Sequence, residues 1–335
     1  MRWHDMALAA RVQRVWYGDD APPLWLLALV PVYRLLRALH LAPWRFGLRR
    51  PARIGVPVIV VGNLTVGGSG KTPLVIALIE ALRANGLTPG AVSRGYGGSD
   101  RGPLLLDDRS DPAQVGDEAC LIQRRTGAKV AIGRDRVAAA RLLVDCGVDV
   151  IVADDGLQHP ALGRDLEICV IDGERRFGNG RLLPAGPLRE SLDRVTTFDF
   201  RVCNGGTPEP GEIAMHLVGS TAVALTDASV CVPVADFVDR RVHAVAGIGN
   251  PQRFFSSLRR SGIELVPHAF ADHYAYRPLD LDFGDNLPVV MTEKDAVKCA
   301  SFAKPEWWCV PVIAELPGDF QEAVLRSCGE SINCR

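Results

Sequence analysis

A glycine-rich loop between an apolar run and a helical pattern constrains this chain more than any other feature. Residues 56–61 are short, apolar and rich in valine, which is typical of a strand buried on both faces. The loop Gly67-Gly68-Ser69-Gly70-Lys71-Thr72 follows, and residues 73–84 then place leucines at helical spacing after an early proline. A strand, a glycine loop and a helix in this order predict an α/β domain.

The loop matches the end of the phosphate-binding pattern G-x-x-x-x-G-K-[ST], with Thr65 at the place of the first glycine. Glycine N–H groups and the helix N-terminus form a cradle for phosphate. Lys71 would reach the β- and γ-phosphates, and the Thr72 hydroxyl would bind Mg²⁺. The alternative is a flexible glycine turn with an incidental lysine. We expect ATP and Mg²⁺ as cofactors, with the nucleotide on Thr65, Val66, Gly67, Gly68, Ser69, Gly70, Lys71 and Thr72.

The alternation of strands and helices continues beyond the loop. Residues 136–146 predict a helix that Gly147 closes, and residues 148–152 and 166–171 predict two more buried strands. Strands that are continuously apolar belong to parallel sheets covered on both faces. We therefore predict a doubly wound, mostly parallel sheet of the kind found in P-loop nucleotide-binding proteins.

Two carboxylates follow the predicted strand that starts at residue 148. Asp154 and Asp155 stand where a P-loop protein needs an acidic group beside the phosphate-bound metal, and carboxylates suit Mg²⁺. The alternative is a solvated turn or a helix cap. Gln158 and His159 lie just beyond and could orient phosphate or substrate, although a structural role for His159 is equally open.

The length of 335 residues favours more than one domain. We expect a P-loop nucleotide-binding domain over 51–210 and a second, smaller α/β domain over 240–330. The Gly- and Pro-rich stretch at 204–214 predicts a linker over 211–239, with a small hairpin formed by residues 215–218 and 221–225. In the second domain we predict strands at 242–246, 288–291 and 308–313, and a helix at 252–261.

The N-terminal segment, residues 1–50, is apolar and basic. Residues 1–53 carry nine arginines against three aspartates, although the whole chain has a net charge of −1. Basic character confined to one end does not fit a protein that coats nucleic acid. The apolar run at 22–33, which Arg34 and Arg37 interrupt, is too short for a membrane span and predicts a helix at an anionic membrane surface. The alternative is an amphipathic helix packed on its own domain.

The nine cysteines lack C-x-x-C pairs and zinc spacing, which favours reduced thiols in the cytosol.

A phosphate loop alone leaves the reaction open, because GTPases, transport ATPases and small-molecule kinases share it. The guanine-specific N-K-x-D box and the L-S-G-G-Q signature of ABC-type ATPases are both missing from the sequence.

Several segments together resemble the tetraacyldisaccharide 4′-kinase (lipid A 4′-kinase) family. They are the loop region 62–73, Ser93-Arg94-Gly95-Tyr96-Gly97, Asp154-Asp155-Gly156-Leu157-Gln158-His159, residues 178–190, Gly247-Ile248-Gly249-Asn250-Pro251, Asp272-His273-Tyr274 and residues 292–298. The resemblance covers nearly the whole chain, and it implies transfer of the ATP γ-phosphate to the 4′-hydroxyl of a membrane-embedded tetraacyldisaccharide 1-phosphate, giving lipid IVA.

The resemblance also implies roles for single residues. Asp117 would accept the proton of the sugar hydroxyl, with His273 as its partner, and Lys71 would complete the catalytic set. Because Asp117 and His273 lie in different predicted domains, the site would form by domain closure. Taken alone, Asp117 could be a helix N-cap and His273 a packing residue. Arg94, Gln158 and Arg189 would bind substrate, and the metal ligands would come from Thr72, Asp154, Asp155 and Glu190.

The resemblance places the protein at the cytoplasmic face of the bacterial inner membrane. Its partners would be the lipid disaccharide and an anionic membrane surface, without nucleic acid, and we expect a monomer. Two alternatives stay open: a membrane-associated ATPase or GTPase switch, and a P-loop kinase for another hydroxyl substrate. The segment Thr292-Glu293-Lys294-Asp295 has no role that the sequence reveals.

Overall fold

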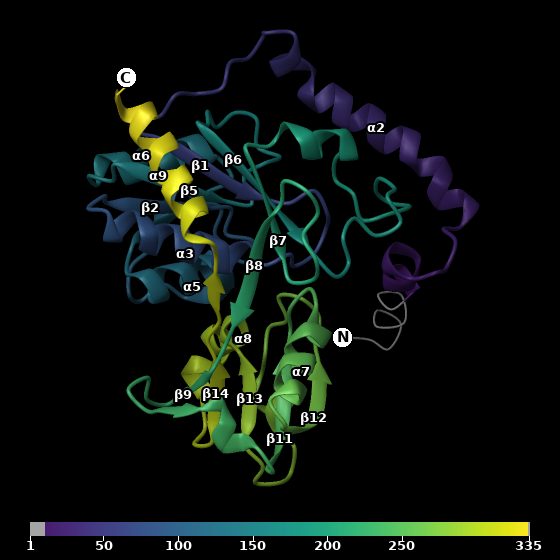
Figure 1. The fold of residues 1–335 in the computed structure, drawn as a ribbon, viewed down its shortest axis with the longest axis vertical. Helices are drawn as coiled ribbons and strands as arrows, with labels where there is room; N and C mark the ends of the chain where they lie inside the picture. The colour runs from purple at the N-terminus through teal and green to yellow at the C-terminus, as the bar shows by residue number, and fades with distance from the viewer. Residues whose placement is uncertain (1–10, 334–335) are drawn as a thin grey trace.

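The computed structural model describes residues 11–333, so residues 1–10 of the predicted N-terminal segment lie outside the described residues. Two sheets dominate the molecule, and Figure 1 shows them one above the other. The first has nine strands in the order β15-β8-β7-β6-β1-β5-β2-β4-β3. Its strands are β1 (Val58–Gly62), β2 (Pro89–Ser93), β3 (Leu104–Leu105), β4 (Lys129–Ile132), β5 (Val150–Asp154), β6 (Leu166–Asp172), β7 (Phe200–Asn204), β8 (Ile213–Val218) and β15 (Ile313–Glu315).

The predicted doubly wound sheet is confirmed. The seven strands from β8 to β4 run parallel, and antiparallel β15 and β3 form the two edges. One face packs against α3 (Lys71–Ala84), α5 (Asp117–Thr126) and α9 (Gly318–Asn333). The other face packs against α6 (Arg136–Asp145). The buried Val and Ile residues of β1 and β5 reach both cores, which explains their continuous apolar pattern.

The second sheet has six strands in the order β10-β9-β14-β13-β11-β12. Its core is parallel, and β9 and β10 join it antiparallel. Helix α7 (Pro251–Arg260) covers one face and α8 (Glu293–Cys299) the other. The strands are β9 (Thr221–Ala224), β10 (Cys231–Pro233), β11 (Arg241–Ala246), β12 (Glu264–Ala269), β13 (Val289–Thr292) and β14 (Trp307–Val310).

The predicted hairpin over 215–218 and 221–225 is wrong. β8 extends the first sheet beside β7 and β15, whereas β9 pairs with β10 and β14 in the second sheet. The chain therefore crosses from one sheet to the other between these two runs. It crosses back between β14 and β15, so the end of the predicted C-terminal domain packs on the first sheet (Figure 1).

Helix α2 (Leu24–Arg45) lies at the outer side of the first sheet (Figure 1). It has 22 residues and continues through Pro31 and Pro43. Within residues 11–333 it is the one helix long and apolar enough to cross a membrane, so the expectation that this segment is too short to span does not hold on length. None of its residues is buried, and its exposed side chains include Trp25, Leu35, Leu36 and Leu39.

Candidate functional site

A large cavity lies where α2 and the two sheets meet. Its volume is about 1540 Å³. Most of the side chains that the sequence singled out reach it: Lys71, Arg94, Asp155, Gln158, His159, Arg189, Glu190 and His273 line its wall. Tyr33, Leu36 and Arg37 of α2 line it as well. One cavity thus joins the phosphate loop to the apolar N-terminal helix.

The phosphate loop leads directly into helix α3. Gly70 is the N-cap, with a positive φ of 90°, and a Cβ there would collide with the side-chain amide of Asn204. That amide donates to the Ser69 carbonyl at 2.9 Å. At the other end of the loop, the Asn63 amide donates to the Gly67 carbonyl at 3.3 Å. The loop is therefore held in shape by two asparagines that the sequence analysis did not identify.

Lys71, the first residue of α3, lies between an amide and a carboxylate. Its Nζ donates to Asn63 Oδ1 at 3.2 Å and lies 3.7 Å from Asp155 Oδ1. Thr72 follows in the first turn of the helix, and Thr65 bridges to Leu188 through the backbone. An ammonium held at the helix N-terminus beside the glycine amides is suited to bind phosphate.

Asp154 is buried at the end of β5 with an unsatisfied carboxylate. It is 1% exposed, and neither oxygen has a hydrogen-bond partner among residues 11–333. Burial, assisted by the charge of Glu118, raises the pKa of Asp154 to about 7. A carboxylate in this situation needs a cation beside it, because burying an unpaired charge is costly.

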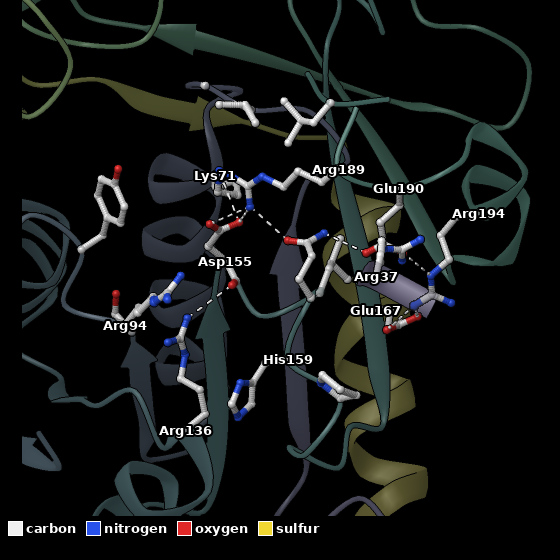
Figure 2. A pocket seen from close by; sticks show the side chains of 18 of the residues that line it. Arg37, Lys71, Arg94, Arg136, Asp155, His159, Glu167, Arg189, Glu190 and Arg194 are labelled. Atoms are coloured by element: carbon white, nitrogen blue, oxygen red, sulfur yellow. Dashed lines mark hydrogen bonds and ion pairs between the residues drawn. The ribbon is translucent and has the colours of Figure 1, made fainter. Parts of the chain in front are cut away.

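Asp155 faces the cavity and binds the cation of Arg189 (Figure 2). Arg189 Nη1 lies 3.0 Å from both Asp155 oxygens and also donates to Gln158 Oε1 at 3.0 Å. Burial raises the pKa of Asp155, but the charges of Lys71 and Arg189 outweigh burial and hold this pKa at about 2. Asp155 is therefore ionised and already paired, whereas Asp154 is not.

Glu190 is buried among cations that come from distant parts of the chain. Arg37 of α2 donates to its Oε2 at 2.5 Å, and Gln158 Nε2 donates to its Oε1 at 2.9 Å. Arg194 Nε lies 3.6 Å from Glu190 Oε2. Figure 2 shows the side chains of Arg37, Glu190 and Arg194 gathered at one side of the cavity. The sequence suggested Glu190 as a metal ligand, but here its charge is balanced by arginines and links α2 to the site.

Asp117 and His273 meet across the two sheets. Asp117 begins α5, and His273 lies in the loop after β12 with a φ of 58°. His273 Nδ1 lies 2.9 Å from Asp117 Oδ1 and 3.1 Å from Oδ2. Burial raises the pKa of Asp117, but the hydrogen bond with His273 and the charge of Lys294 outweigh burial and lower this pKa below its ordinary value. The carboxylate is therefore ionised and held by a partner from the opposite sheet.

The remaining predicted residues lie on the cavity wall opposite Glu190. Arg94 follows β2 and is exposed to the cavity. His159 Nε2 is buried without a partner in the described part of the chain, and burial together with Arg136 and Arg164 lowers the His159 pKa to about 4. Arg136 is buried and donates to the backbone carbonyls of Asp154 and Asp155 (Figure 2). These hydrogen bonds fix the backbone that carries the two carboxylates.

The structure adds residues that sequence reasoning missed. Arg175 donates to the carbonyls of Gly68 and Gly249, and it thereby joins the phosphate loop to the second sheet. Lys294 lines the cavity beside His273. The signal for Lys294 was present in the segment that had no assigned role, whereas an isolated arginine such as Arg175 gives no signal in one sequence.

The donor set fits a magnesium ion that is shared with phosphate. Among the described residues, no group of three or more His, Cys, Asp and Glu side chains is arranged to hold a metal by itself. Mg²⁺ in nucleotide sites is bound by one or two protein groups, substrate phosphates and water. The orphaned Asp154 carboxylate and the Thr72 hydroxyl beside the phosphate loop match that requirement.

Comparison with known proteins gives one consistent result. The family model described as Tetraacyldisaccharide-1-P 4′-kinase matches residues 23–329. The tetraacyldisaccharide 4′-kinase of Stenotrophomonas maltophilia is 50% identical over 321 residues, which covers 92% of this chain and 94% of the relative. That of Xanthomonas euvesicatoria is 50% identical over 328 residues, with 94% and 95% covered.

A solved structure agrees with these relatives. The crystal structure of LpxK from Aquifex aeolicus in complex with ATP superposes with a TM-score of 0.74 at 26% sequence identity. The match covers 90% of this chain and 98% of that one. The two chains therefore share their fold over most of their length.

Proposed function

The chain belongs to the tetraacyldisaccharide-1-P 4′-kinase family, and we propose that it transfers the γ-phosphate of ATP to the 4′-hydroxyl of a tetraacyldisaccharide 1-phosphate, forming lipid IVA. One observation carries the proposal: Lys71 of the phosphate loop and His273, the partner of Asp117, line the same cavity. A phosphate donor and a base that serves the acceptor can meet there. A nucleotide switch has no use for such a pair.

The nucleotide binds at the loop from Thr65 to Thr72. The backbone N–H groups and Lys71 hold the phosphates, and the Lys71 ammonium stabilises the charge that develops during transfer. Thr72 and Asp154 hold Mg²⁺, which when bound neutralises phosphate charge. Asp155, fixed by Arg189, keeps Lys71 in place.

Asp117 serves as the base of the reaction. A sugar hydroxyl is a weak nucleophile at neutral pH, so a carboxylate within reach must take its proton as the new bond forms. The hydrogen bond from His273 orients the Asp117 carboxylate. Arg94 is exposed on the cavity wall, and its planar guanidinium suits an anionic group of the lipid substrate. Gln158 and Arg189 complete the substrate side.

Helix α2 brings the cavity to the membrane. Its outward side carries exposed leucines, and its inner side lines the cavity through Tyr33, Leu36 and Arg37. A lipid acceptor can thus keep its acyl chains in the bilayer while its sugar enters the site. Because ATP is cytoplasmic, we place the protein at the cytoplasmic face of the inner membrane. We further propose that the protein acts as a monomer.

The two sheets act as two domains that close over the cavity. Several of the contacts between them are polar: Arg175 joins Gly68 to Gly249, and Arg125 pairs with Glu293 at 2.8 Å. Polar contacts of this kind separate and reform at low cost, which suits a site that must admit a nucleotide.

Product analysis tests the proposal. The purified chain is incubated with Mg-ATP and tetraacyldisaccharide 1-phosphate in detergent, and the lipid is weighed by mass spectrometry. We expect a gain of one phosphate, which Lys71→Met should abolish. Release of free phosphate without a phosphorylated lipid would instead indicate the nucleotide switch, and phosphorylation of another hydroxyl would indicate a different substrate.

A further inference from the structure

The segment Thr292-Glu293-Lys294-Asp295 connects the second sheet to the Asp117–His273 pair. Thr292 ends β13 and caps α8, accepting the Asp295 amide hydrogen at 3.2 Å. The Asp295 side chain is fully buried and accepts from the Gly247 amide at 2.9 Å and from Tyr276 Oη at 3.1 Å. These contacts fix the first turn of α8, and that turn presents Lys294 to the cavity.

The Lys294 ammonium lies among groups from both sheets. Its Nζ donates to Glu118 Oε1 at 3.0 Å and to Asp272 Oδ1 at 3.1 Å. It lies 3.3 Å from His273 Nε2. Glu118 belongs to α5, which packs on the first sheet. Asp272 lies beside His273 in the loop after β12 of the second sheet. The Lys294 side chain is only 15% exposed, so this position is defined by its partners and not by solvent.

We propose that Lys294 is a positioning residue for the reaction: its ammonium requires a lone pair on His273 Nε2, so the ring proton resides on Nδ1 and is donated to Asp117. This inference rests on the proposed function, because it assigns to Asp117 the role of base. It gives the segment at 292–295 a purpose that the sequence did not reveal.

The argument depends on the two ring nitrogens of His273. An ammonium offers only hydrogens, so the nitrogen that faces it must be an acceptor. A neutral imidazole then carries its proton on the other nitrogen, which here faces the carboxylate at 2.9 Å. In the opposite tautomer a hydrogen would point at the Lys294 ammonium and a lone pair at the Asp117 carboxylate. Both contacts would be repulsive.

The surrounding charges keep the Lys294 ammonium protonated, and the carboxylate of Asp272, which faces His273 Nε2, lies 3.7 Å from it, beyond hydrogen-bond distance. Burial lowers the pKa of Lys294, but the charges of Glu118, Asp117 and Asp272 outweigh burial and raise this pKa above its ordinary value. The ammonium therefore stays charged. A second cation, Lys298, lies 3.8 Å from Asp117 Oδ2 and pairs with Asp295 at 2.8 Å.

Burial and Lys294 lower the pKa of His273, whereas the hydrogen bond and charge of Asp117 and the charge of Asp272 raise it, with a net rise. The Tyr96 ring packs against the imidazole with the centroids 4.7 Å apart. Lys294 opposes the doubly protonated ring, whereas the carboxylates of Asp117 and Asp272 favour it. Above the raised pKa the ring is neutral, and Lys294 then selects its tautomer.

Kinetics on the full-length protein provide the first test. Lys294→Met should lower kcat about 10- to 100-fold, while the KM for ATP changes less than about twofold. Because Asp117 loses a nearby cation, its pKa rises, and the acid limb of kcat should move to higher pH by about one unit. Lys304→Met, an exposed lysine distant from the site, is the matched control. A lower kcat with an unmoved pH profile would show that Lys294 is merely structural.

A double-mutant cycle identifies the route of the effect. Lys294 also acts directly on the pKa of Asp117, so the cycle is measured at a pH above the acid limb of every variant, where Asp117 is fully ionised. If the remaining effect of Lys294 acts through the imidazole, adding Lys294→Met to His273→Ala should there change kcat by less than about twofold. Two losses that multiply would overturn the proposal. A failure of the proposed function is distinct, since the wild-type chain would then phosphorylate no lipid at all.

Nitrogen NMR of the wild-type protein tests the tautomer without any variant at Lys294. With ¹⁵N-labelled histidine rings, the His273 signals are assigned by their loss in His273→Ala. At pH 8 we expect a protonated Nδ1 and an unprotonated Nε2. A proton on Nε2, whether in the other tautomer or in the doubly protonated ring, would sink the inference.

Discussion

Gly249 of the second sheet lies directly against Gly68 of the phosphate loop. A Cβ on Gly249 would stand 3.0 Å from the Gly68 Cα and closer still to the Gly68 amide nitrogen. Arg175 fastens the same contact by donating to the carbonyl of each glycine. The closed arrangement of the two sheets therefore requires glycine at position 249.

Gly249→Ala should hold the two sheets apart. The methyl group meets backbone, which cannot move aside as a side chain can, so closure over the nucleotide is impaired. We expect kcat/KM for the lipid to fall at least about tenfold, with the thermal unfolding midpoint nearly unchanged. Gly318→Ala is the control, because a Cβ there meets no atom within 4 Å. Wild-type kinetics in Gly249→Ala would contradict the need for this contact.

Asp117→Asn should remove the base and little else. The amide has the size of the carboxylate but cannot take a proton, so kcat should fall about 10²- to 10⁴-fold while ATP binds normally. Asp145→Asn, on the exposed end of α6, serves as the control. Equal losses in turnover and in ATP affinity would mean that Asp117 is structural.

The pH profile of His273→Ala gives the sign of the electrostatic effect. A base works only when deprotonated, and the hydrogen bond with His273 helps to lower the pKa of Asp117. Removing the ring raises that pKa, so the acid limb of kcat should shift to higher pH. Steady-state rates between pH 5 and about 9 would measure the shift. A shift toward lower pH would contradict the orientation of this pair.

Arg37→Met, a substitution in helix α2, should lower the catalytic efficiency. Arg37 pairs with the buried Glu190, and Tyr33 on the same side of α2 donates to the Arg189 carbonyl at 2.8 Å. Since Arg37 is partly exposed, we expect a loss of only five- to tenfold in kcat/KM, roughly 1 kcal/mol. Arg34→Met removes the same charge from the exposed side of α2 and should leave the detergent assay unchanged. Equal effects of the two variants would argue against a specific contact.

Replacing the outward leucines of α2 should release the protein from membranes. Leu24, Leu35 and Leu39 are 83%, 60% and 61% exposed, and none of the three lines the cavity. Changing all three to serine removes the apolar area that would enter the bilayer, and binding to vesicles containing anionic lipid should drop more than tenfold in a sedimentation assay. Leu279→Ser, which is 81% exposed on the second sheet, is the control. Undiminished vesicle binding by the triple variant would mean that another surface holds the membrane.

The sequence predicted local structure well because the local patterns were strong. The β-branched runs that became β1 and β5 are buried on both faces, which is typical of strands in a parallel sheet covered by helices on both sides. The two runs near residue 220 show the limit. Their patterns are alike, yet β8 and β9 belong to different sheets, and the choice depends on partners almost 100 residues further along the chain.

In the candidate site, too, the local pattern was predictable and the long-range pairing was not. The sequence predicted which residues gather there, but it could not show which charges neutralise one another. Asp154 and Asp155 are adjacent and chemically identical, yet the first is buried without a partner among residues 11–333 and the second is paired with Arg189. That difference comes from the turn at Asp155, whose φ of 49° sends the two carboxylates in different directions.

The return of the chain to the first sheet governs the order in which the molecule can be completed. β15 and α9 pack onto strands and helices made some 100 residues earlier or more, and Phe320, Val324 and Cys328 fill part of the first core. On the ribosome, the second sheet emerges whole while this part of the first core is still uncovered. The nucleotide-binding half, although begun first, is therefore completed after the second sheet, once β15 and α9 have left the exit tunnel.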